Sequence, residues 1–143
     1  MAAPCPAIPP QFGGGIANSF GDALTVRDCT LSDNTAEVGG GILNDGTLDV
    51  RGSTFKGNTA SDSGGGIYNR GDAFHPATAT VQGGSTLSGN SAGSDGGGIF
   101  NGAAATLTID DSMVLNNVAL VGADLYNLGK ATVNDSTVGI IGP

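Results

Sequence analysis

Large aromatic side chains and charged side chains are both scarce in this 143-residue sequence. Aromatic residues make up 5% of the chain, tryptophan is absent and charged residues make up 13%, against a usual charged share of about 25%. A core built from large rings is therefore excluded. No apolar run approaches the ~20 residues of a membrane-spanning helix, so we expect no membrane insertion. The net charge of −8 disfavours a phosphate-binding surface, and we expect no nucleic-acid partner.

Glycine, in contrast, is abundant, and it marks a repeat. The 26 glycines lack the three-residue period of collagen and are concentrated in blocks. Five similar segments begin at Gly13, Gly39, Gly64, Gly96 and Gly122, so their starts are 26, 25, 32 and 26 residues apart. Such a period is typical of a solenoid, whose units bury their apolar faces against one another. We expect an N-terminal arm or cap over 1–12 and five repeats over 13–143.

Each repeat alternates apolar and polar residues with the period of short β-strands. Leu48–Val50 and Leu107–Ile109 read apolar, polar, apolar, whereas helical periodicity is missing. A second stretch in each repeat ends on an inward aliphatic residue, as in Ser85–Leu87, and the glycine block leads into a third, such as Ile67. These features predict an all-β, single-domain parallel β-helix of about five coils with three short strands each. Successive coils would stack about 4.8 Å apart.

Asparagine recurs at two fixed places in the repeat. One set follows the inward aliphatic residue of the glycine block by two positions, and the other follows the second-strand aliphatic residue by three. Asparagine tolerates the left-handed conformation of a tight corner, and stacked amides can form a hydrogen-bonded ladder. We therefore expect two structural ladders, formed by Asn18, Asn44, Asn69, Asn101 and Asn127, and by Asn34, Asn58, Asn90 and Asn117.

The motifs GGGIYN (Gly64–Asn69), FKGN (Phe55–Asn58) and LSGN (Leu87–Asn90) resemble the GGA[ILV] and FxxN repeats of chlamydial polymorphic membrane proteins. They are equally similar to the GGGIxN…STFSGNTA repeats of large secreted bacterial proteins. The resemblance extends from Gly13 to about Val138. It implies a right-handed parallel β-helix of the pectate-lyase-like type, and a secreted or surface-displayed protein such as an adhesin passenger. No signal peptide is visible at the start of this chain.

The third repeat is about six residues longer than the others, and its insertion is a candidate ligand or partner loop. It contains Arg70, Gly71, Asp72, Phe74 and His75, the only histidine. Insertions in a solenoid map to surface loops, which often carry binding sites. The first three of these residues spell the integrin-recognition tripeptide, but a chance tripeptide in a tolerated insertion is the simpler interpretation. We expect no metal here, because a lone histidine beside one aspartate is a weak ligand set.

The two ends of the solenoid are a candidate assembly surface. The proline-rich arm ends at Phe12, and the fifth repeat ends with Ile140 and Ile141, the latter at the position that Asn117 holds in the fourth repeat. Apolar residues at an open strand edge favour head-to-tail stacking of copies into a filament. A trivially exposed end is the alternative interpretation.

The two cysteines, Cys5 and Cys29, are a candidate disulfide. In a secreted protein such a bond would attach the arm to the first coil, close a loop of roughly 24 residues and contribute ~3 kcal/mol. A buried thiol and a free thiol are an equal alternative. Two cysteines without nearby histidines do not form a zinc site.

Outward threonines of the first strand form a regular array that resembles the ice-binding face of β-solenoid antifreeze proteins. Asp49 and Lys130 interrupt the array. Threonine is also simply favourable on the outward face of a strand, which is the alternative interpretation. The candidate face consists of Thr25, Thr47, Thr78, Thr80, Thr106, Thr108 and Thr132.

A catalytic site is not expected. Asp28, Asp111 and Asp135 fall in one column of the repeat and offer a weak set of calcium ligands, and we expect no other cofactor. No basic residue recurs beside them, and short loops form no cleft. We therefore interpret the chain as a non-catalytic extracellular β-solenoid, either an adhesin-like stalk or a subunit that stacks head to tail. Its partners would be itself, a host surface or a glycan. The alternatives are an ice-binding module and a carbohydrate-binding or polysaccharide-lyase-like remnant.

Overall fold

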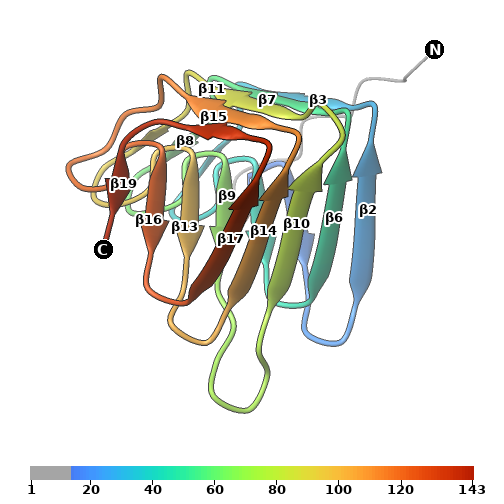
Figure 1. Ribbon diagram of the computed structural model, residues 1–143. Helices are drawn as coiled ribbons and strands as arrows, with labels where there is room; N and C mark the ends of the chain where they lie inside the picture. The colour runs from blue at the N-terminus through green and yellow to red at the C-terminus, as the bar shows by residue number, and fades with distance from the viewer. Residues whose placement is uncertain (1–13) are drawn as a thin grey trace.

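The computed structural model describes residues 14–143, and every regular element in this part of the chain is a β-strand. Strands from successive turns pair in parallel and form four sheets, which we call A to D. In Figure 1, the strands of sheet B face the viewer and those of sheet C lie across the top. The repeat therefore folds as the stacked parallel β-helix that its sequence predicts.

Sheets A, B and C each take one strand from each of the five turns, and sheet A has a sixth strand at its C-terminal end. Sheet A contains β1 (Ile16–Asn18), β5 (Ile42–Asn44), β9 (Ile67–Asn69), β13 (Ile99–Asn101), β16 (Leu125–Asn127) and β19 (Ile141–Gly142). Sheet B contains β2 (Ala23–Arg27), β6 (Thr47–Arg51), β10 (Thr78–Gln82), β14 (Thr106–Asp110) and β17 (Lys130–Asn134). Sheet C contains β3 (Thr30–Ser32), β7 (Thr54–Lys56), β11 (Thr86–Ser88), β15 (Met113–Leu115) and β18 (Thr137–Val138).

Sheet D is an addition to the three strands per coil that the sequence predicts. It contains β4 (Thr35–Ala36), β8 (Thr59–Ala60) and β12 (Ser91–Ala92). The alanines point inward, where a bend leaves room only for a small side chain. The residues before them are polar, so a two-residue strand carries too short a pattern to be recognised from the sequence.

The core consists of aliphatic columns that run along the axis of the helix. Ile42 pairs with Ile67, which pairs with Ile99, and all three are fully buried. Val50 and Val81 stack in the same way in sheet B. Fully burying one such side chain contributes about 1.5–3 kcal/mol. The stacked aliphatic columns therefore stabilise this core, a role that large aromatic side chains have in many other proteins.

The backbone conformation at the corners differs from what we expected for asparagine. None of the ladder asparagines has a positive φ, so the expected left-handed conformation at those residues is wrong. Asp, Gly and one other asparagine hold the corners instead, because these residues adopt the left-handed region at the lowest cost. Three columns share this conformation: Asp28, Gly52, Gly83, Asp111 and Asp135; Asp33, Gly57, Gly89 and Asn116; and Gly39, Gly64, Gly96 and Gly122.

The fifth turn is shortened, which corrects a second expectation. Ile141 pairs with Leu125 and therefore begins a sixth turn in sheet A, so it does not take the place of Asn117. The chain passes from Val138 in sheet C to Ile141 in sheet A through only two residues, Gly139 and Ile140. The fifth turn therefore contributes no strand to sheet D.

An aromatic stack on the outer face of sheet A was not anticipated. The ring centroids of Tyr68 and Phe100 lie 4.5 Å apart and nearly parallel, and those of Phe100 and Tyr126 lie 5.3 Å apart. Phe100 is only 9% exposed although it points away from the core. Burial raises the pKa of Tyr68, whereas the nearby Arg70 opposes this shift. The stacked rings shield one another from solvent. They extend the outward column that includes Leu43, which pairs with Tyr68.

Candidate functional sites

The long loop between β9 and β10 projects beyond the other turns (Figure 1). Its first residue, Arg70, forms a two-pronged ion pair with Asp45 of the preceding turn, with Nε–Oδ1 and Nη2–Oδ2 distances of 2.6 and 2.5 Å. At the tip, Phe74 is 89% exposed. The loop is thus fixed at its base by a charge pair and offers an aromatic side chain to solvent.

The rest of the loop is organised around Asp72. The backbone N–H groups of Phe74 and His75 donate to its Oδ1, each at 2.8 Å, and His75 Nδ1 lies 3.2 Å away. The hydrogen bond from Phe74, followed by that from His75, lowers the pKa of Asp72. The His75 ring packs on Phe20 of the first turn, with centroids 3.9 Å apart.

The charged groups of the Arg70–Asp72 tripeptide are therefore both engaged within the chain. Arg70 and Asp72 remain partly exposed, with 50% and 63% of their side-chain surface accessible. An integrin-type contact would have to compete with Asp45 and with the loop backbone. The geometry favours the aromatic tip, rather than the tripeptide, as the contact element. A hollow of about 180 Å³ lies beside it and is lined by Phe20, Asp45, Arg70, Gly71, Asp72 and His75.

The outward threonines of sheet B stack in register. Thr78 lies between Thr47 and Thr106, and Thr108 lies between Thr80 and Thr132. Thr25 is separated from this block because its neighbour is Asp49. The Asp49 carboxylate accepts hydrogen bonds from Arg51 Nε and Gln82 Nε2, both at 2.7 Å. Burial raises the pKa of Asp49, but these two hydrogen bonds outweigh it and leave the pKa below its usual value.

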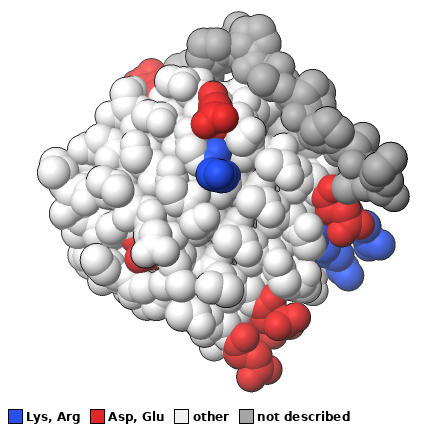
Figure 2. Space-filling model, turned by 90° about the horizontal axis from the view of Figure 1, so that it is seen from above, with Lys and Arg blue, Asp and Glu red and all other residues white. Residues whose placement is uncertain are grey.

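A second threonine column, on the outer face of sheet C, was missed by the sequence interpretation. Thr30, Thr54 and Thr86 stack in register, and Met113 and Thr137 continue the column. Figure 2 views the molecule from this side and shows a largely uncharged face with a few separate charged groups. This column could have been predicted from the sequence, because an outward Thr precedes an inward Leu or Phe in the second strand of the first three repeats.

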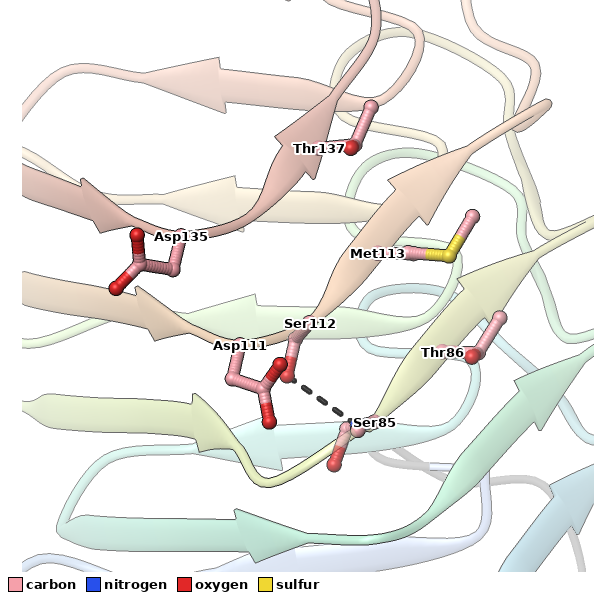
Figure 3. Close-up of a pocket in the computed structure, with 8 residues that line it drawn as sticks. Ser85, Thr86, Asp111, Ser112, Met113, Asp135 and Thr137 are labelled. Atoms are coloured by element: carbon pink, nitrogen blue, oxygen red, sulfur yellow. Dashed lines mark hydrogen bonds between the residues drawn. The ribbon is translucent and has the colours of Figure 1, made fainter.

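A groove lies at the corner between sheets B and C, across the third, fourth and fifth turns (Figure 3). It has a volume of about 310 Å³ and is lined by Gly84, Ser85, Thr86, Asp111, Ser112, Met113, Asp135 and Thr137. Asp111 and Asp135 are there because the corner needs a left-handed residue. Within residues 14–143, no group of three or more His, Cys, Asp or Glu side chains could hold a metal ion.

The two asparagine columns form continuous hydrogen-bonded ladders. In the first, the Nδ2 of each asparagine donates to Oδ1 of the asparagine one turn further along, from Asn18 to Asn127, at 2.7–2.8 Å. In the second, Asn34, Asn58 and Asn90 donate in the same direction at 2.9 Å, and Asn117 is the last asparagine. Both ladders therefore point their donors toward the C-terminal end.

Asp124 completes the second ladder where the shortened fifth turn brings no asparagine. Its Oδ1 accepts from the backbone N–H and from Nδ2 of Asn117, each at 2.9 Å, and its Oδ2 accepts from Ile140 N–H at 2.7 Å. Asp124 is 4% exposed. A carboxylate only accepts hydrogen bonds when it is ionised, so it suits the donor end of a ladder. At the opposite end, Oδ1 of Asn34 is buried and accepts no hydrogen bond from residues 14–143.

A serine column adds a third set of rungs. The backbone N–H of Cys29, Ser53, Ser85 and Ser112 each donates to the serine Oγ of the next turn, at 3.0–3.2 Å. The dashed line in Figure 3 marks one of these bonds. The cysteine therefore stands at the first position of a serine ladder. No cysteine in the described residues is free, and Cys5 lies outside them, so the Cys5–Cys29 disulfide stays a prediction.

The C-terminal end exposes apolar side chains. Ile140 is 65% exposed and Ile141 is 56% exposed, and Val133 is 42% exposed because no further strand covers it. Phe12, the other candidate assembly residue, lies outside the described residues. No helix in residues 14–143 could span a membrane.

Comparison with protein families gives one match. Residues 52–70 match the model of the Chlamydia polymorphic membrane protein (Chlamydia_PMP) repeat. The matched segment runs from the end of β6 to Arg70 and contains both FKGN and GGGIYN, so the resemblance of these motifs to the polymorphic membrane protein repeat is confirmed. Neither the curated proteins nor the solved structures gave a match. The match is shorter than one full turn and runs from sheet C of the second turn into sheet A of the third; the strands in it pair in register with those of the adjacent turns.

Proposed function

We propose that this chain is a non-catalytic structural β-solenoid of the adhesin type, displayed at the cell surface or secreted. The observation that carries the proposal is the interruption of an otherwise uniform rod by one projecting loop with an exposed Phe74. The match to the polymorphic membrane protein repeat supports a surface role. The buried asparagine and serine side chains form hydrogen bonds within the ladders and therefore have a structural role. The long loop, in contrast, interrupts the repeat in the third turn.

The contact made by the loop would be an aromatic one. The ring centroids of Phe74 and His75 lie 6.5 Å apart, and the hollow beside the loop is lined by the rings of Phe20 and His75 together with the charged side chains of Asp45, Arg70 and Asp72. Such an arrangement suits a glycan or a protein surface on a host cell, because aromatic rings pack against apolar faces while charged groups accept or donate hydrogen bonds.

A binding assay tests this proposal. Fluorescently labelled chain is applied to cultured epithelial cells and to a glycan array, with Phe74→Ser as the loop variant and Leu128→Ser, another exposed apolar residue, as the control. We expect saturable binding that falls at least tenfold in Phe74→Ser and is unchanged in Leu128→Ser. No binding to either surface, equal binding by both variants, or cleavage of array polysaccharides would contradict the proposal.

Head-to-tail assembly is the self-associating form of this proposal. The exposed Ile140 and Ile141 at an open strand edge favour it. In sheet A a stacked copy would pair with β19, because β19 already covers β16, and Asp124 already closes the second asparagine ladder. Negative-stain images and sedimentation at high concentration test it: fibres that disappear in Ile141→Lys support stacking, and monomers at high concentration exclude it.

Ice binding is a second candidate function, favoured by the register of Thr78, Thr80, Thr106 and Thr108 on sheet B. A flat array of hydroxyl and methyl groups at the strand spacing is the feature required. Thermal hysteresis is the assay, with Thr80→Lys as the test variant and Thr54→Lys on sheet C as its control. Hysteresis that is lost only in Thr80→Lys supports this function, and its absence from the unmodified chain excludes it.

A further inference from the structure

The shortened fifth turn leaves the edge of sheet D open. In turns one to three, Thr35–Ala36, Thr59–Ala60 and Ser91–Ala92 pair with one another as β4, β8 and β12. In the fourth turn, Val118 continues this sheet by pairing with Ser91. The fifth turn passes directly from sheet C to sheet A, so no strand of the described chain lies against Val118 on its other side.

The backbone groups at this edge are unpaired. The carbonyls of Asn34, Asn58 and Asn90 accept N–H groups from the next turn at 2.8–2.9 Å, and Ala92 N–H donates to Val118 at 2.8 Å. The equivalent groups of the fourth turn are the carbonyl of Asn117 and the N–H of Ala119. Neither makes a hydrogen bond within residues 14–143. The edge therefore presents an acceptor and a donor at the spacing of a parallel β-ladder.

The side chains change character at the same place. Val118 takes the position of Thr35, Thr59 and Ser91, and Leu120 takes that of Glu37, while Val121 lies against Asp95. Val118, Leu120 and Val121 are 63%, 83% and 44% exposed. The loop is not slack, because the N–H groups of Leu120 and Val121 both donate to the Ser94 carbonyl. Apolar side chains held at an open strand edge mark a place where another strand can pair.

The neighbouring turns supply negative charge. Asp62 N–H donates to the Glu37 carbonyl, and Ser94 N–H donates to that of Asp62, so these loops stack toward the apolar patch. Asp95 pairs directly with Val121. Glu37, Asp62 and Asp95 form none of the ion pairs found within residues 14–143. An occupant with basic side chains would therefore find complementary charge beside the apolar patch.

We propose that the step at Asn117–Val121 binds an extended segment of a partner protein by β-strand addition. The segment would run parallel to β12, place apolar side chains at alternate positions against Val118 and Leu120, and carry Lys or Arg beside the acidic loops. A second copy of this chain fits less well, because the fifth turn of one copy would meet the first turn of the next while their sheet D edges were still one strand spacing, ~4.8 Å, too far apart to pair.

A peptide-binding experiment tests the proposal directly. The probe is a fluorescent peptide of sequence KNVALVK, which copies residues 117–121 between two lysines. We expect saturable binding with a Kd between about 10 µM and 1 mM. Hydrogen–deuterium exchange read by NMR should show the Ala119 amide exchanging faster than the Ala92 amide in the free chain, and protected at least tenfold when the peptide is bound.

Matched peptides and variants distinguish backbone pairing from nonspecific apolar binding. KNVPLVK lacks the central N–H, and ENVALVE reverses the flanking charge, so both should bind at least tenfold more weakly. Leu120→Ser should weaken binding at least tenfold, whereas Leu128→Ser, a change at another exposed leucine, should not. Circular dichroism checks that both variants are folded. Absent binding, equal affinity for the proline peptide or for the acidic peptide, or no protection of Ala119 would overturn the proposal.

Discussion

Replacing Asn58 by alanine should destabilise the rod far more than its small volume suggests. Asn58 is fully buried, and its Oδ1 accepts both the backbone N–H and Nδ2 of Asn34, at 3.2 and 2.9 Å. The substitution leaves these two donors in the interior without an acceptor. Each unsatisfied buried group costs ~1–3 kcal/mol, so we expect a loss of about 2–6 kcal/mol. Stability for a chain of this size is roughly 7–20 kcal/mol.

The measurement is chemical denaturation in urea, followed by circular dichroism, together with the thermal midpoint. A loss of this size should lower Tm by about 5–20 °C. Asn134→Ala is the control: Asn134 is exposed and its side chain lies outside both ladders, so its stability should stay within about 0.5 kcal/mol of the unmodified chain. If Asn58→Ala also stays within about 1 kcal/mol, the ladder does not stabilise the fold in the way described.

Three further substitutions or titrations examine other parts of the geometry. Asp124→Asn should cost about 1–3 kcal/mol in the same urea assay, because its amide would place a donor against Ile140 N–H; an unchanged midpoint would count against its role in closing the ladder. Gly65→Val should prevent folding, since a Cβ would lie 2.4 Å from two backbone carbonyl oxygens; soluble protein with the original spectrum would contradict the close stacking of turns. The lowered pKa of Asp72 means that loop order is fully present above the ordinary value of 3.8 and is lost as the pH falls through the lower folded-state pKa. The carboxyl carbon resonance of Asp72 should therefore titrate with a midpoint below 3.8, and a midpoint at or above that value would be inconsistent with this account.

The columns could be predicted from sequence because each one repeats a single chemical type. Ile42, Ile67 and Ile99 recur after GG dipeptides, and a buried column admits only aliphatic residues, so the register follows from the alignment. The asparagines were placed in ladders for the same reason, yet their backbone conformation was misjudged. Asparagine is common both at left-handed corners and in buried ladders. The spacing placed Asn117 in the ladder, but only the structure shows that the left-handed residue is its neighbour Asn116.

The features that escaped prediction depend on single turns. Asp124 lies seven residues after Asn117 and outside the asparagine alignment, so nothing in the repeat marks it as the end of the ladder. The two-residue crossing from Val138 to Ile141 likewise looks like a continued repeat until pairing shows that Ile141 stacks on Leu125. A periodic sequence predicts the common turn well, whereas an exception is determined by contacts that occur only once.

The most direct test of the stacked architecture is methyl NMR on a sample labelled at isoleucine. Because Ile42 pairs with Ile67 and Ile67 with Ile99, nuclear Overhauser contacts should join the first with the second and the second with the third. The contact between Ile42 and Ile99 should be weak or missing, since two strand spacings, about 9.6 Å, separate them. Contacts that skip a turn, or none among the three, would show that equivalent residues do not lie above one another.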